Sequence, residues 1–231
     1  MRFIFIPGLG ADARVFEEYV KAFPDSVVLE WLSPMPAENL ETYARRLARS
    51  VTPSPPCIVV GLSFGGMLAP NIAEELGAEY CVLLASAKSG RDFPRRYRAG
   101  RFLFRWFPWL ILMTIALGKC GVRVLNWLPG SKWRSVREQF LESPTRQMFH
   151  FLRMILDWAF ESSQEVPERK TPLLQIHGDK DRLIPIKNVR PDVVIPGGGH
   201  LFLLTHFDAV LPILLDLEKK GSSGNCVPKN N

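Results

Sequence analysis

The chain has 231 residues, which is long enough for one α/β domain, whereas two full domains would be cramped. Apolar residues make up 47% of the chain and charged residues 23%, an ordinary globular composition that argues against an intrinsically disordered protein. The net charge of +6 favours acidic partners but does not determine the fold.

The N-terminus and the cysteines bear on location. The chain runs from Met1 directly into the apolar stretch FIFIPG, without a cleavage site, so we expect no secretory signal. The cysteines have no metal-ligand spacing, and we expect free thiols in a reducing compartment. They are Cys57, Cys81, Cys120 and Cys226. These features predict a cytoplasmic protein.

Continuous apolar runs alternate with segments of helical period along the chain. The runs predict strands at 2–6, 27–32, 57–61, 80–85, 172–177 and 192–196. Because they are apolar throughout, they indicate strands covered on both faces of a parallel sheet. The helical segments lie near 12–23, 38–51, 64–76 and 207–219. This alternation predicts βαβ units, with helices on both faces of the sheet.

Residues 88–168 break this rhythm, because they hold helical and aromatic-rich sequence without a strand-like run. They predict a helical cap inserted into a core made of 1–87 and 169–219, with a flexible tail at 220–231. The charge-free part of the cap, 106–117, is too short to span a bilayer. A cap helix packed over the core is favoured, and a helix peripheral to a membrane, in its headgroup region, is the alternative.

The sequence GLSFG at 61–65 lies between a predicted strand and a predicted helix. This G-x-S-x-G order places Ser63 on a sharp turn, where the small residues Gly61 and Gly65 let the strand and the helix approach each other. The turn directs the Phe64 N–H toward the site, where it can stabilise an oxyanion. A second such donor is expected from Leu9, in the loop PGLGAD after the first strand. Ser63 is therefore the candidate nucleophile.

A serine nucleophile needs a base, and the base needs an orienting acid. His200 closes the glycine-rich loop IPGGGH after the last strand and is the candidate base. The loop HGDKDRLIP after the penultimate strand offers two candidate acids, Asp179 and Asp181. His177, which opens that loop, is expected to brace it.

With these motifs in order, the chain resembles an α/β-hydrolase. The resemblance rests on PGLGADARVF, GLSFGGMLA, HGDKDRLIP and GGGH, and covers nearly the whole chain outside the insertion and tail. It implies a reduced α/β-hydrolase fold: a mostly parallel sheet of about six strands, with a helical cap. The family pattern H-G-x-x-D-x-x-x-P selects Asp181 as the acid. One departure is Pro7-Gly8, where many relatives have His-Gly.

The resemblance and the site residues together predict a serine hydrolase that cleaves carboxylic esters or thioesters of apolar acyl groups, without metal or organic cofactor. The overall pattern is similar to small bacterial α/β-hydrolases of unassigned substrate, and the serine turn to esterases that act on acyl-carrier-protein esters. The alternatives are an acyltransferase, an esterase that docks a carrier or lipid, and a non-enzymatic ligand-binding protein.

Two features of the insertion bear on substrate and partners. Trp106, Trp109 and Trp158 either line an apolar acyl pocket or form the core of the cap itself. A basic cluster either docks an acidic carrier protein or an anionic membrane surface, or is a solvated basic face. The cluster comprises Arg91, Arg95, Arg96, Arg98 and Arg101. Nucleic acid is not an expected partner, because no recognition motif accompanies these arginines.

Overall fold

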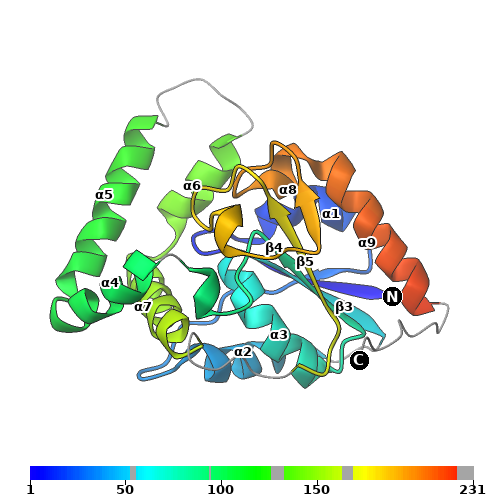
Figure 1. Ribbon diagram of the computed structural model, residues 1–231, viewed down its shortest axis with the longest axis horizontal. Helices are drawn as coiled ribbons and strands as arrows, with labels where there is room; N and C mark the ends of the chain where they lie inside the picture. Colours follow the sequence, from blue (N-terminus) through cyan, green and yellow to red (C-terminus); the bar gives the residue numbers. More distant parts are fainter. Residues whose placement is uncertain (53–55, 94, 126–132, 163–168, 223–231) are drawn as a thin grey trace.

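The computed structural model describes residues 1–52, 56–93, 95–125, 133–162 and 169–222. Within these ranges six strands form one sheet, in the spatial order β2-β1-β3-β4-β5-β6, and every neighbouring pair is parallel (Figure 1). The strands are Arg2–Ile6 (β1), Val27–Val28 (β2), Cys57–Leu62 (β3), Tyr80–Leu84 (β4), Leu173–Gly178 (β5) and Val193–Ile195 (β6). The predicted α/β class and parallel sheet are confirmed.

Strand β2 is shorter than the strand predicted at 27–32, because pairing with β1 ends at Val28. Beyond that point the indole N–H of Trp31 donates a hydrogen bond to the carbonyl of Ala11, at 2.8 Å. The Trp31 ring packs on Phe64, with 5.5 Å between the ring centroids. The Leu29 N–H still donates to the carbonyl of Phe5, at 2.8 Å, and beyond it Trp31 packs against the loop after β1 and against Phe64.

Helices cover both faces of the sheet, as predicted (Figure 1). Side chains alternate along each strand, so that Ile4 and Val59 face one apolar core while Phe5 and Val60 face the other. The first core is covered by α2 (Leu40–Ala48) and α3 (Phe64–Leu76). The second is covered by the 3-10 helix η1 (Ala13–Phe16), α1 (Glu17–Ala22), α8 (Phe202–Thr205) and α9 (Phe207–Ser222). Burial on both faces explains why the strands are apolar throughout.

Helix α9 continues into the segment predicted as a tail, 220–231. Its last turns are supported by an ion pair between Lys220 and Asp216, one helical turn apart, at 2.7 Å. The helix ends at Ser222, and residues 223–231 lie outside the described part of the chain. The predicted start of the tail was therefore too early.

The segment after β4 forms helices that lie beyond the carboxyl ends of the strands (Figure 1). They are the 3-10 helix η2 (Gly90–Asp92), α4 (Arg95–Trp106), α5 (Trp109–Leu125), α6 (Arg134–Glu142) and α7 (Thr145–Glu161). Ile111 and Ile115 of α5 pack with Met148 and Leu156 of α7 in a small core. The segment has the predicted helical character, and its division from the core at 88 and 168 stays a prediction.

An aromatic cluster packs α7 against helices α2 and α3, which cover one face of the sheet. The ring of Phe151 lies between Trp31, Tyr43 and Phe64, with centroid distances of 5.1, 5.2 and 4.9 Å. All but Trp31 are fully or almost fully buried. The cap helix and the helix that follows Ser63 therefore share one core.

No single helix in the described part of the chain is long and apolar enough to cross a membrane. Residues Gly100–Trp106 of α4 and Trp109–Arg123 of α5 reach the length and apolar composition of a membrane span only when they are counted together. The chain bends by 109° between these two segments.

Candidate active site

Ser63 lies at the turn between β3 and α3 in a strained conformation. Its φ of +51° and ψ of −113° are values that residues other than glycine rarely adopt. Two hydrogen bonds hold the turn: the Ser63 N–H donates to the carbonyl of Leu84 at 2.9 Å, and the Ser86 hydroxyl donates to the Ser63 carbonyl at 2.6 Å. The strained backbone turns the Ser63 side chain out of the sheet edge.

The two glycines that flank Ser63 allow the close approach on which this turn depends. A Cβ atom on Gly65 would collide with the backbone carbonyl oxygens of Ile6 and Pro7, and one on Gly61 would collide with the carbonyl of Gly65. Strand β3, the end of β1 and the start of α3 are thus too close together for any side chain at these positions.

Ser63, His200 and Asp181 form a continuous series of hydrogen bonds. His200 Nε2 lies 2.9 Å from Ser63 Oγ, and His200 Nδ1 lies 2.8 Å from Asp181 Oδ2. The side chain of Asp181 is fully buried, whereas that of His200 is 16% exposed. Asp179, the other candidate acid, has a buried Oδ1 without a hydrogen-bond partner in the described part of the chain. The structure therefore joins Asp181, and not Asp179, to His200.

The surroundings of Asp181 favour its ionised form. Its Oδ1 accepts hydrogen bonds from the N–H groups of Leu183 and Ile184, at 2.8 and 3.0 Å. Burial raises the pKa of Asp181, but hydrogen bonds from His177 and His200, the charge of His200 and the Ile184 N–H together hold that pKa well below its usual range. An ionised Asp181 can accept a hydrogen bond from the protonated Nδ1 of His200 and so orient the imidazole toward Ser63.

His177 braces the acid loop, as the sequence suggested. Its Nε2 lies 2.8 Å from the carbonyl of Ile184 and 3.3 Å from Asp181 Oδ2, and the side chain is fully buried.

We expect the stability contributed by Asp181 to depend on pH. Because its folded-state pKa lies below the unfolded value of about 3.9, the ionised carboxylate stabilises the fold above that pH. This stabilisation is lost as the pH falls toward the folded-state pKa. Asp181→Asn should therefore melt at a lower temperature than the wild type at pH 7, and the difference should shrink below about pH 4. Thermal melts of both proteins across this range check the prediction, and a difference that does not change with pH contradicts it.

The loop after β1 lies directly beside Ser63. A Cβ atom on Gly8 would stand 3.5 Å from the Cβ of Ser63, and Gly10 adopts a φ of +74° that favours glycine. This loop carries Leu9, one predicted oxyanion donor. The other, Phe64, is the first residue of α3, so its N–H has no carbonyl partner within the helix.

Helix α6 holds the far end of this loop, a contact that sequence reasoning missed. The Asp12 N–H donates to Gln139 Oε1 at 2.9 Å, and Gln139 Nε2 donates to the hydroxyl of Ser135 at 3.0 Å. Gln139 is buried, and Arg14 forms ion pairs with both Asp12 and Glu142. No motif marks Gln139, because a glutamine in a helix is as a rule exposed.

A cavity of about 420 Å³ opens at Ser63 and His200. Its walls are mainly apolar and come from the loop after β1, from α3, from cap helices and from the acid and histidine loops. The lining residues are Gly8, Leu9, Gly10, Ala11, Val15, Leu62, Ser63, Met67, Phe93, Val122, Val136, Arg137, Phe140, Ile155, Leu183, Ile184, His200 and Leu201.

Of the two positions considered for Trp106, Trp109 and Trp158, a lining of this cavity does not agree with the structure, because none of the three is among its lining residues. Trp106 and Trp109 lie on α4 and α5 with 67% and 56% of their surface exposed. Trp158 packs edge-on against Phe93 on the side of α7 that faces the sheet. The cavity is instead lined by smaller cap residues such as Val122 and Val136.

The arginine cluster is only partly described. Side chains of Arg95, Arg96 and Arg98 lie outside the described part of the structure. Arg101 is engaged within the cap, because its Nε donates to Asp157 at 2.8 Å and its guanidinium lies 4.3 Å from the ring centre of Phe160. In the described residues, no group of three or more His, Cys, Asp or Glu side chains could hold a metal ion.

Comparisons with known proteins agree with this architecture. The chain is 32% identical over 75 residues to a Synechocystis sp. protein provisionally named non-heme chloroperoxidase, over 28% of this chain and 27% of that protein. It is 25% identical over 175 residues to a poly(3-hydroxyalkanoate) depolymerase of Ectopseudomonas oleovorans, over 68% and 59% of the two chains. It thus spans less than two thirds of either curated relative.

Among solved structures, MenH from S. aureus is similar in fold, with a TM-score of 0.70 and 17% identity over 96% of this chain and 94% of that one. A family model described as "Alpha/beta hydrolase family" matches residues 3–213. Because this match covers nearly the whole chain, the protein belongs to the alpha/beta hydrolase family.

Proposed function

We propose that this protein is a serine hydrolase that cleaves carboxylic esters of apolar acyl groups through an acyl-enzyme. The observation that carries the proposal is the hydrogen-bonded series Ser63–His200–Asp181 at the mouth of an apolar cavity. The relative named as a poly(3-hydroxyalkanoate) depolymerase, by that name an enzyme that acts on a polyester, supports ester cleavage.

In the first half of the reaction, Ser63 Oγ attacks the acyl carbonyl carbon while His200 Nε2 takes the hydroxyl proton. Asp181 stabilises the imidazolium that forms. The N–H groups of Leu9 and Phe64 would stabilise the negative charge on the carbonyl oxygen. The bond to the leaving alcohol then breaks, His200 returns the proton to the alcohol oxygen, and the acyl group stays on Ser63.

In the second half, water takes the place of the alcohol. His200 removes a proton from the water molecule as the water oxygen attacks the acyl carbon. The bond between the acyl carbon and Ser63 Oγ then breaks. His200 gives the proton back to Ser63, which leaves a free carboxylic acid and the starting enzyme. Ser63 and His200 thus take part in both half-reactions.

The walls of the cavity indicate the substrate class. Its volume of about 420 Å³ lies within the range of pockets for small ligands, roughly 300–1,000 Å³. Apolar side chains such as Met67, Val136 and Phe140 face the space beside Ser63. This environment favours an apolar acyl chain of medium length.

We expect p-nitrophenyl esters to be hydrolysed with an optimum at medium acyl length. Val136→Phe, which fills part of the cavity, should shift the optimum to shorter acyl chains while acetate ester turnover is retained. The measurement is kcat/KM over a series from acetate to laurate for both proteins. A length profile that does not change in Val136→Phe would contradict the assignment of this cavity.

A fluorophosphonate probe tests the nucleophile without any assumption about the substrate. It should label the wild type at Ser63, as located by peptide mass spectrometry, because an activated serine attacks the phosphorus of the probe and displaces fluoride. Ser63→Ala should remain unlabelled. Equal labelling of both proteins, or none in a folded wild type, would overturn the proposed function.

A further inference from the structure

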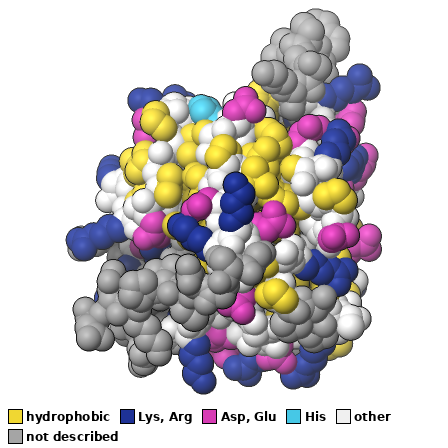
Figure 2. All heavy atoms as spheres, turned by 90° about the vertical axis from the view of Figure 1, so that its right-hand side faces the viewer, with side chains coloured by type: hydrophobic (Ala, Val, Ile, Leu, Met, Phe, Trp, Pro, Cys, Tyr) yellow, Lys and Arg dark blue, Asp and Glu magenta, His cyan; other side chains and the backbone are white. Residues whose placement is uncertain are grey.

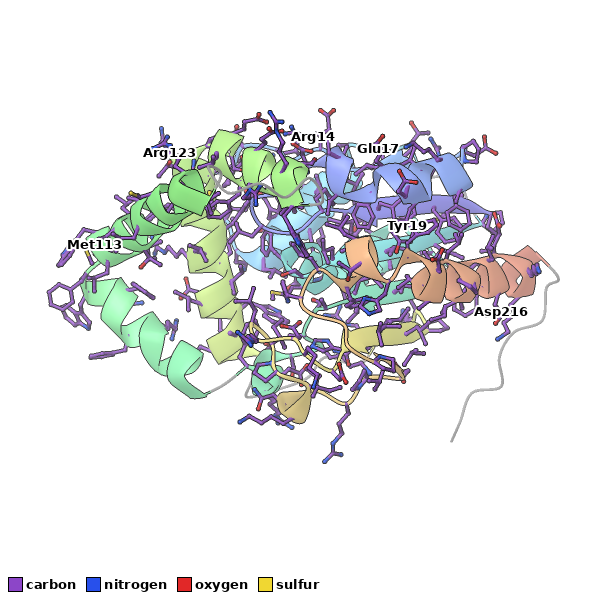
Figure 3. The ribbon with its side chains drawn as sticks, turned by 90° about the horizontal axis from the view of Figure 1, so that it is seen from above. Arg14, Glu17, Tyr19, Met113, Arg123 and Asp216 are labelled. Atoms are coloured by element: carbon purple, nitrogen blue, oxygen red, sulfur yellow. The ribbon has the colours of Figure 1, made fainter. Side chains whose placement is uncertain are left out.

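Helices α4 and α5 expose large apolar side chains on the side that faces away from the sheet. We call this set the outer face; it comprises Phe102, Trp106, Trp109, Leu112, Met113 and Leu117, each at least 44% exposed. Figure 3 shows Met113 at the outer margin of α5, directed away from the rest of the molecule. Single exposed apolar residues are ordinary, but a set that continues over two successive helices marks an interaction site.

The opposite side of α5 packs against the rest of the molecule. Ile111 and Ile115 are almost fully buried against Met148 and Leu156. Helix α5 is therefore apolar on two sides, and only the inner side packs against the described part of the chain. The side of the molecule that carries α9 is different, because charged side chains of both signs are interspersed there with hydrophobic ones (Figure 2).

The charge of this helix pair is of one sign. In sequence, helices α4 and α5 carry basic residues and no acidic residue: Arg95, Arg96, Arg98, Arg101, Arg105, Lys119 and Arg123. Arg101 pairs with Asp157, and Lys119 donates to the carbonyls of Leu141 and Ser143, so Arg105 and Arg123 are the basic residues on which the inference rests. Arg105 and Arg123 are exposed, and Figure 3 shows Arg123 near the end of α5. Basic residues beside an apolar face with tryptophans are the composition that binds the headgroup region of anionic membranes.

The bend between α4 and α5 suits helices that lie along a membrane surface rather than helices that cross the bilayer. Neither helix is long and apolar enough to span a bilayer alone, and the chain bends by 109° between them, next to Pro108. A bent pair of short helices can lie within the headgroup region with its outer face toward the acyl chains.

We propose that the outer face docks onto an anionic lipid bilayer, and that ester substrates reach the cavity from that surface. The second part rests on the proposed function. Helix α5 contributes Val122 to the cavity wall, and the next helix, α6, contributes Val136 and Phe140. The docking element is thus also a wall of the cavity, so a lipid-borne acyl ester is the substrate class that fits both.

Sedimentation with large vesicles tests docking without any need for turnover. The full chain should bind vesicles of equal parts phosphatidylglycerol and phosphatidylcholine, and should bind pure phosphatidylcholine vesicles more weakly. Added salt should weaken the binding, because part of the attraction is electrostatic. No sedimentation with either vesicle would overturn the proposal.

The double variant Trp109→Glu, Met113→Glu should lower the vesicle partition coefficient on the order of a hundredfold, because two apolar side chains can no longer be buried in the interface. Val194→Glu is the matched control, since Val194 is 46% exposed on β6, outside the cap, as Met113 is 46% exposed on α5. The control should bind like the wild type. Equal binding by the double variant would overturn the proposal.

Two further readouts separate the alternatives. If the wild type self-associates without lipid in sedimentation velocity, and the double variant does not, a second copy covers the outer face and the membrane proposal fails. Turnover of dispersed p-nitrophenyl butyrate distinguishes the two proposals. Turnover without vesicle binding removes docking alone, whereas vesicle binding without turnover removes the proposed hydrolase function and leaves docking in place.

Discussion

Ser63→Ala is expected to lower kcat for ester hydrolysis by at least about a thousandfold, because the variant has no oxygen to attack the acyl carbon. The Ser63 side chain contacts His200 through a single hydrogen bond. Alanine fits the same space, so the melting temperature should stay close to that of the wild type. Steady-state kinetics with circular-dichroism melts measure both effects. Retained turnover in a folded Ser63→Ala would exclude Ser63 as the nucleophile.

Ser63→Gly separates catalysis from backbone strain. Glycine adopts the φ of +51° without the steric cost that serine carries. The variant should therefore be as inactive as Ser63→Ala but more stable than it, by roughly 1 kcal/mol in the free energy of unfolding. A Ser63→Gly protein that is less stable than Ser63→Ala would show that the turn is not strained in the way its dihedral angles indicate.

Gly65→Ala is expected to lower the free energy of unfolding by roughly 3 kcal/mol, since the added methyl group forces apart groups that cannot rotate away. The atoms that it would meet are the backbone carbonyl oxygens of Ile6 and Pro7, at the end of β1. Displacement of this strand end would also move the loop that carries Leu9, so activity should fall as well. Urea denaturation followed by fluorescence measures the stability.

Gly121→Ala provides the matched control for this substitution. Gly121 lies within α5, and no atom stands within 4 Å of a Cβ atom added there. Alanine favours the helix, so this variant should be slightly more stable than the wild type, by up to about 1 kcal/mol. If both variants lost the same stability, close approach at Gly65 would not be the cause.

Much of the fold and the candidate triad could be predicted because the relevant signals are local in the sequence. Apolar runs bounded by turns mark buried strands, and parallel strands bring their carboxyl ends to one edge of the sheet. Ser63, Asp181 and His200 each follow such a strand, so their meeting follows from topology. The end of β2 could not be predicted in this way, since the apolar run continues to Leu32 although the strand ends at Val28 and Trp31 packs elsewhere.

The cap was less predictable because its helices are apolar on more than one side. Tryptophans there could line the cavity or form the core of the cap, and composition does not distinguish these two positions. The structure places Trp106 and Trp109 outside and gives the cavity wall to Val122 and Val136. Ser86 was missed although a signal existed, because it follows β4 at the same sheet edge as Ser63.

The aromatic cluster around Phe151 limits which substitutions α7 can accept. Phe64, which follows the nucleophile, is buried under a ring contributed by the insertion. Loss of the Phe151 ring would remove the contacts that cover Phe64 and Tyr43 next to the turn that carries Ser63. Helix α7 and the helix that follows Ser63 therefore depend on each other for packing, and we expect a substitution at Phe151 to disturb the surroundings of Phe64.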